Sequence, residues 1–201
     1  MKTICLFAFA GVFAFACPSV QAVPIFYNFT LSGANESPPN GSLGTGSGIV
    51  MFDTQVHQMF IELNFVGLIG NTTSANLHAA TEVAGAGIAR VATPARLFPR
   101  VPAGVPYVGY SMMFSMLDPS SYNPIFIAAN GGNPFAAELS LAAAAAAGKA
   151  YFNINTTAFP GGEIRGFLTP APARVPDSGS TLSMLCVIIG GLSGLRRKLG
   201  C

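Results

Sequence analysis

The residues best suited to chemistry in this 201-residue chain form two short polar pairs in its middle. Asn76 and His78 stand two positions apart, and so do Glu163 and Arg165. If each pair lies on a β-strand, period-two alternation puts its members on one face of a sheet. An imidazole beside an amide suits hydrogen bonding to a ligand. A carboxylate beside a guanidinium makes either a polar binding pair or a structural ion pair, and we favour the ion pair, with Glu36 nearby.

Reactive constellations do not accompany these pairs. The sequence contains no G-x-S-x-G, no H-E-x-x-H and no phosphate-binding glycine loop, and its acidic residues are scattered. The only other histidine, His57, falls in a predicted turn, where we expect it to be exposed to solvent. We therefore predict a protein that is not an enzyme and that has no metal or cofactor.

The first 22 residues are typical of a secretory signal peptide. Lys2 supplies the positive start, residues 4–16 are apolar, and small residues at the −3 and −1 positions predict cleavage after Ala22. The alternative is a lipoprotein signal cut before Cys17, although the residues that precede this cysteine fit a lipidation site poorly.

Residues 173–201 run from a polar motif through an apolar stretch to a basic end. The apolar stretch, 182–195, has about 14 residues, whereas a stable membrane span needs about 20. Arg196, Arg197 and Lys198 would stay on the cytoplasmic side during export. We expect a sorting tail with transient membrane insertion; the alternative is a buried core helix, which three glycines would weaken.

The tail resembles the VPDSG variant of the PEP-CTERM sorting signals of exported bacterial proteins. The resemblance implies recognition by an exosortase-type sorting protease. The motif residues are Val175, Pro176, Asp177, Ser178 and Gly179.

Removing both ends leaves residues 23–172, which is enough for one domain of ordinary size. All four cysteines lie in the ends, so this middle can form neither a disulfide nor a thiolate metal site. Residues 23–174 carry six basic and seven acidic side chains, a net charge of −1. A nearly neutral domain does not favour nucleic-acid binding.

The middle predicts short strands separated by Gly, Pro and Asn, together with one helix. The alanine-rich run 136–147 stops at Gly148 and indicates the helix. This pattern predicts an all-β fold, an immunoglobulin-like antiparallel sandwich or Greek-key barrel with one short helix. The expected strands are 25–32, 47–53, 59–66, 72–79, 107–117, 150–156 and 163–169, with 83–92 ambiguous.

Three segments, LSGANESPP (31–39), SANLHAA (74–80) and AYFNINTTAFPGGEIRGFL (150–168), resemble the motifs of CHRD domains. The family is thought to have an immunoglobulin-like β-barrel with limited similarity to copper–zinc superoxide dismutases. Family histidines map to Asn76, His78 and Asn155, so only one is retained. The resemblance implies a polar cluster of these residues that would hold a transition metal poorly.

We therefore expect an exported bacterial protein sorted to the cell surface, outer membrane or extracellular matrix. It would act by interaction, with extracellular polysaccharide or another protein as partner. The candidate binding residues are Asn76, His78, Asn155, Glu163 and Arg165. The alternative is a metal-binding module or metalloenzyme related to the dismutase-like barrels, with His78 as the surviving ligand.

Overall fold

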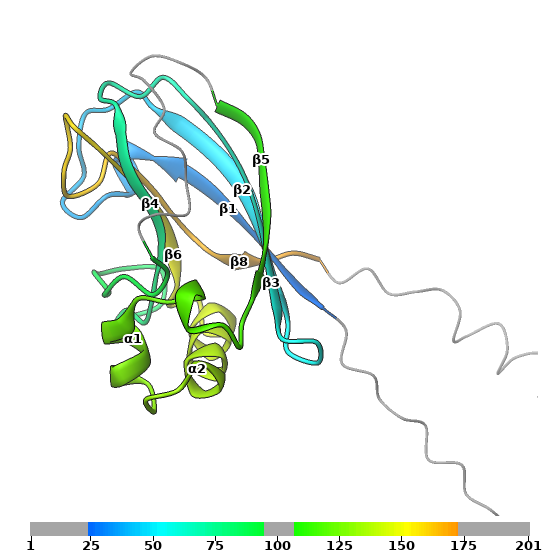
Figure 1. Ribbon diagram of the computed structural model, residues 1–201. Coiled ribbons are helices and arrows are strands. Elements are labelled where there is room, and N and C mark those ends of the chain that lie inside the picture. The colour runs from blue at the N-terminus through cyan, green and yellow to red at the C-terminus, as the bar shows by residue number, and fades with distance from the viewer. Residues whose placement is uncertain (1–23, 95–106, 173–201) are drawn as a thin grey trace, which may run out of the picture.

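The computed structural model describes residues 24–94 and 107–172, which form one curled antiparallel sheet with two helices gathered at one end (Figure 1). The helices are α1, Pro124–Ala129, and α2, Pro134–Ala146. The strands are β1 (Ile25–Ser32), β2 (Thr45–Asp53), β3 (Gln58–Val66), β4 (Thr72–His78), β5 (Tyr107–Ser115), β6 (Tyr151–Thr156), β7 (Ile164–Phe167) and β8 (Thr169–Pro170).

The strand order β4-β6-β7-β1-β2-β3-β5 confirms the predicted all-β antiparallel class, in the form of a curled half-barrel. Strand β8 pairs with β1 off this path, so the described chain ends beside the strand on which it begins. The core fills the concave side with alternating apolar residues. Its fully buried members include Leu31, Ile61, Leu77, Phe152 and Ile164.

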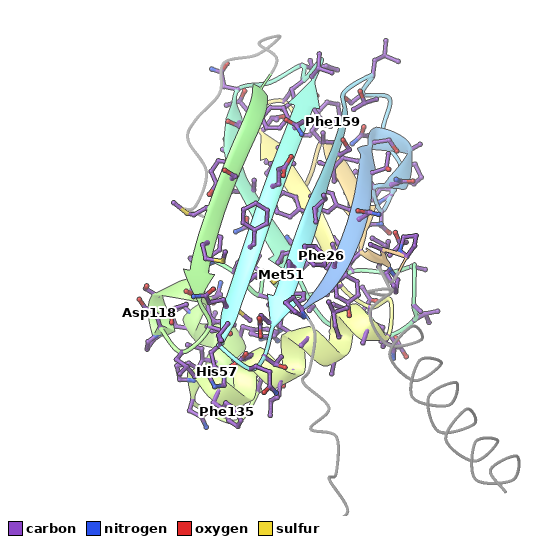
Figure 2. The ribbon with its side chains drawn as sticks, turned by 90° about the vertical axis from the view of Figure 1, so that its right-hand side faces the viewer. Phe26, Met51, His57, Asp118, Phe135 and Phe159 are labelled. Atoms are coloured by element: carbon purple, nitrogen blue, oxygen red, sulfur yellow. The ribbon has the colours of Figure 1, made fainter. Side chains whose placement is uncertain are left out.

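Alternation of apolar and polar residues explains why the strand predictions agree with the structure. In β1, Tyr27, Phe29 and Leu31 are buried while their neighbours are largely exposed, which is the pattern expected for a half-buried strand. The convex face also carries a transverse row of large apolar side chains, two of which are labelled in Figure 2. Register aligns Phe26, Met51, Phe60 and Met113 across four strands.

Helix α2 confirms the predicted helix and begins two residues earlier, because Asn133 caps it. The Asn133 side chain accepts a hydrogen bond from the backbone N–H of Ala136, and Gly148 follows the helix with a φ of +67°. Helix α1 was not predicted, since six residues are too few to show a helical period. Its start is marked by the same signal, a capping Asn123 followed by Pro124.

His57 lies in the β2–β3 turn as expected, but its side chain is only 30% exposed and is held by a contact with α2. Its Nδ1 lies 2.7 Å from Oε2 of Glu138, a residue of α2 that is only 1% exposed. The His57 ring also packs edge-on against Phe135, and both residues are labelled where the β2–β3 turn meets α2 (Figure 2). The turn therefore attaches the helical end of the molecule to the sheet.

Two other segments are less regular than the sequence suggested. The ambiguous stretch 83–92 forms only isolated bridges, His78 with Val91 and Val83 with Ala86. The predicted strand 163–169 is divided into β7 and β8.

Within 24–94 and 107–172, no helix has the length and apolar character needed to cross a membrane. The predicted signal peptide with its cleavage after Ala22, and the tail 173–201, lie outside the described residues.

Candidate functional site

Strand register places most of the predicted polar residues on one convex face of β4, β6 and β7. His78 lies opposite Tyr151 and Asn76 lies opposite Asn153 in the β4–β6 ladder. Arg165 lies opposite Asn153 in the β6–β7 ladder. Because directly paired residues project to the same side of a sheet, these five side chains share one surface, which we call the polar face.

Asn155 lies at the far end of the polar face and has its own partners. Its Nδ2 donates to the carbonyl of Pro160 at 2.6 Å, and its Oδ1 accepts from Nδ2 of Asn153 at 3.3 Å. The structure thus brings Asn76, His78 and Asn155 onto one face, but each contacts different groups.

His78 is held as a neutral ring beneath the 83–93 segment. Its Nδ1 lies 2.9 Å from the carbonyl oxygen of Ala89, and its ring stacks on Tyr151 with centroids 4.7 Å apart. Burial lowers the pKa of His78, the nearby charge of Arg165 lowers it further, and the bond to Ala89 acts in the opposite direction. Since Nδ1 donates to a carbonyl, the buried Nε2 is left as an acceptor, and it has no partner among the described residues.

The donor set around His78 does not fit a multi-histidine metal centre. Asn76 is 2% exposed and its Nδ2 donates to the carbonyl of Thr93 at 3.0 Å. No group of three His, Cys, Asp or Glu side chains within the described ranges is placed to hold a metal ion. Asn76 and His78 instead hold the 83–93 segment against β4 through Thr93 and Ala89.

Arg165 forms the centre of the polar face and does not pair with Glu163. Its Nε donates to the carbonyl of Asn35 at 2.8 Å, and its Nη1 donates to that of Gly87 at 3.0 Å. Its Nε also lies 3.9 Å from Oε2 of Glu36, so the ion pair anticipated for this strand is made with Glu36.

Aromatic rings support the Arg165 side chain from below. The Arg165 guanidinium carbon lies 4.7 Å from the ring centroid of Tyr151 and 5.5 Å from that of Phe167. Cation–π attraction of this kind is strongest where water is excluded, and Arg165 is only 5% exposed. The guanidinium therefore has a fixed position at the surface of the sheet.

Glu163 occupies a separate, fully buried position at the end of the sheet. Its Oε1 accepts from the hydroxyl of Ser42 at 2.7 Å and the backbone N–H of Ile69 at 2.6 Å. Its Oε2 accepts from the hydroxyl of Thr156 at 2.6 Å and the N–H of Gly70 at 3.3 Å. Four donors from three parts of the chain make Glu163 a structural carboxylate rather than a ligand-binding group.

Glu36 is the most unusual ionisable group on this surface. It is 8% exposed, and its Oε1 and the Oδ1 of Asn153 are both buried without a partner among the described residues. Gly162, at a φ of +136°, leaves the necessary room, because a Cβ there would lie 2.6 Å from Glu36 Oε1. Burial raises the pKa of Glu36 to about 7, although the positive charge of Arg165 opposes the shift.

A groove opens beside this pair. Its volume is about 570 Å³, and it is open to solvent rather than enclosed. One wall is the 34–37 loop, the other is the glycine-rich 85–87 loop, and strands β1, β7 and β8 supply the remainder. Beside Glu36 and Arg165, the side chains that line the groove include Thr30, Asn35, Phe167 and Thr169.

Sequence reasoning missed two residues of this site, Tyr151 and Asn153, and it placed Glu36 near the Glu163–Arg165 pair without recognising its burial. A signal for the first two was present, because Tyr151, Asn153 and Asn155 alternate along one strand and must share a face. Glu36 lies about 130 positions from Arg165 in the chain, and no local pattern connects them.

Comparison with known proteins agrees with both resemblances. A model of the CHRD domain matches residues 27–168, and a model of the VPDSG-CTERM motif matches residues 174–199. Searches of curated proteins and of solved structures returned no match.

Replacing Glu163 by Gln should lower the free energy of unfolding by about 3 kcal/mol. The amide would present N–H groups to partners that are themselves donors. Denaturant unfolding measures the change. Glu62→Gln, at a half-buried position on the convex face of β3, is the matched control and should change stability by less than about 0.5 kcal/mol. Equal effects of the two substitutions would contradict the structural role of Glu163.

Glu36 should make stability depend on pH between about 4.5 and 7. The Glu36 carboxyl ionises near pH 4.5 in the unfolded chain and near pH 7 in the folded one. Its contribution to the free energy of unfolding is therefore fully present below this window, and up to about 3 kcal/mol of it is lost as the pH rises through the window. Glu36→Gln removes the titration of this side chain and leaves the titrations of the other ionisable groups in place. The stability of the native protein minus that of the variant should therefore fall between pH 4 and 8; a constant difference would show that Glu36 does not titrate abnormally.

Proposed function

The chain belongs to the CHRD domain family, and from that premise we propose that it is a non-enzymatic binding module that acts through the groove beside Glu36 and Arg165. The C-terminal sorting motif supports an exported protein directed to the cell surface. We further propose that an exosortase-type protease processes the tail near Val175–Gly179, and that the partner is an extracellular polysaccharide or protein.

The proposal rests on the observation that the ionisable side chains of this region are held in fixed positions by the protein itself. Glu163 accepts four hydrogen bonds, and Arg165 is anchored by Asn35 and Gly87. His78 is stacked on Tyr151 and bonded to Ala89. Of these three side chains, Arg165 is the one that lines the groove, and a guanidinium fixed in this way can recognise a ligand with little loss of conformational entropy.

A groove-filling substitution tests the binding function. Ala34 is exposed on the groove wall, and Ala34→Trp should block the groove without touching the Glu36–Arg165 pair. Ala143→Trp, at an exposed position of α2 outside the groove, is the control. Full-length protein immobilised in detergent should retain a component of the cell-surface fraction that Ala34→Trp loses and Ala143→Trp keeps. Equal retention by all three proteins would refute the groove as the binding site.

Sorting is tested separately through Asp177. Asp177→Ala should leave the protein in the membrane fraction, because the altered motif would no longer be processed. Glu82→Ala removes an exposed carboxylate from the domain and should distribute like the native protein. The same fractionation pattern for Asp177→Ala and the native protein would count against the role of the motif.

A further inference from the structure

We propose that the groove binds a neutral sugar residue of a saccharide chain, an inference that rests on the binding function proposed above. Three features of the groove support it: its balanced charge, an aromatic ring beside hydroxyl-bearing side chains, and its open shape.

Charge is the first feature. Among the described residues, the lining of the groove contains two ionisable side chains, Glu36 and Arg165, and Nε of Arg165 lies 3.9 Å from Oε2 of Glu36. They are 8% and 5% exposed, so each presents only a small part of its surface. The Glu36 carboxyl beside the guanidinium would disfavour an anionic ligand, and the guanidinium of Arg165 would disfavour a cationic one. A hydroxyl group can donate to one and accept from the other, so neutral vicinal hydroxyls match this pair best.

The second feature is the ring of Phe167, which lines the groove and is half-buried. Tyr151 packs against it with centroids 5.3 Å apart, which fixes its orientation. The same groove is lined by side chains that can bond hydroxyl groups, namely Thr30, Asn35, Ser37 and Thr169. A pyranose has an apolar face of C–H groups and a polar rim, so it complements an aromatic ring bordered by hydroxyls and an amide.

Shape is the third feature. The volume of about 570 Å³ lies within the range of about 300–1,000 Å³ that is usual for small-molecule sites. Gly85 and Gly87 form one wall, and nothing lies within 4 Å of the positions their Cβ atoms would take. A groove that is open to solvent leaves room for a chain to continue beyond the bound residue, whereas an enclosed pocket would admit only a terminal residue.

The test is isothermal titration of the full-length protein in detergent with four tetrasaccharides. Three are neutral, namely cellotetraose, maltotetraose and chitotetraose, and tetragalacturonate is acidic. We expect binding of at least one neutral compound, lost in Ala34→Trp and retained in Ala143→Trp. Phe167→Leu keeps an apolar side chain but removes the flat ring, and it should weaken binding roughly five- to tenfold. If thermal melting shows that Phe167→Leu is unfolded, the exposed Thr30→Val should weaken binding instead.

Several outcomes overturn the inference: binding of tetragalacturonate alone, binding of none of the four, or equal affinity for Ala34→Trp and the native protein. Monosaccharide analysis after acid hydrolysis separates this inference from the proposed function. If the surface component that the native protein retains and Ala34→Trp loses releases no sugar on hydrolysis, the groove binds but its ligand is not a saccharide. If the native protein retains no surface component that Ala34→Trp loses, both proposals fail.

Discussion

The buried carboxylate of Glu163 is the constraint on which the rest of this domain depends. One side chain receives hydrogen bonds from the β1–β2 connection, the β3–β4 connection and the end of β6. Its backbone carbonyl, together with that of Gly162, accepts from Asn40. Because residues 23–174 contain no cysteine, this polar centre does for one end of the sheet what a disulfide does in many exported domains. Removing the charge would leave several donors unpaired at once.

The second polar centre, at Arg165, follows from the first. Two residues beyond Glu163, the chain has entered β7 and presents the guanidinium to the opposite side of the sheet end, where Asn35, Glu36 and Gly87 meet it. The opening motif and the GGEIRG segment are thereby joined although they are far apart in sequence. The groove lies where these two loops approach the sheet, so the contacts that stabilise the fold also position the candidate binding surface.

The sequence predicted what local periodicity can encode. Alternation located the strands, and a terminal glycine located the end of α2. Prediction from the sequence failed where contact with one residue distant in the chain determines the position of a side chain. His57 is in a turn, but Glu138 attracts it; Glu163 and Arg165 have strand spacing, but Glu163 lies in a bend before β7 begins and turns toward Ser42 and Thr156. The groove could not be predicted, because it depends on how loops cross the sheet. Glu36 was expected near the Glu163–Arg165 pair, but the sequence did not show that it would replace Glu163 as the partner of Arg165.

The position of β8 has a mechanical consequence. Two residue pairs, Tyr27 with Pro170 and Asn28 with Thr169, join this strand to β1, and the N–H of Ala171 donates to the carbonyl of Phe26 just beyond it. Force applied to the segment that follows β8 would separate these pairs one after the other. Strand β7 would resist next, because the anchored Arg165 and the buried end at Glu163 must yield together. Force applied through the residues that follow 172 would therefore meet β8 first and reach the anchored strand β7 only after β8 has separated from β1.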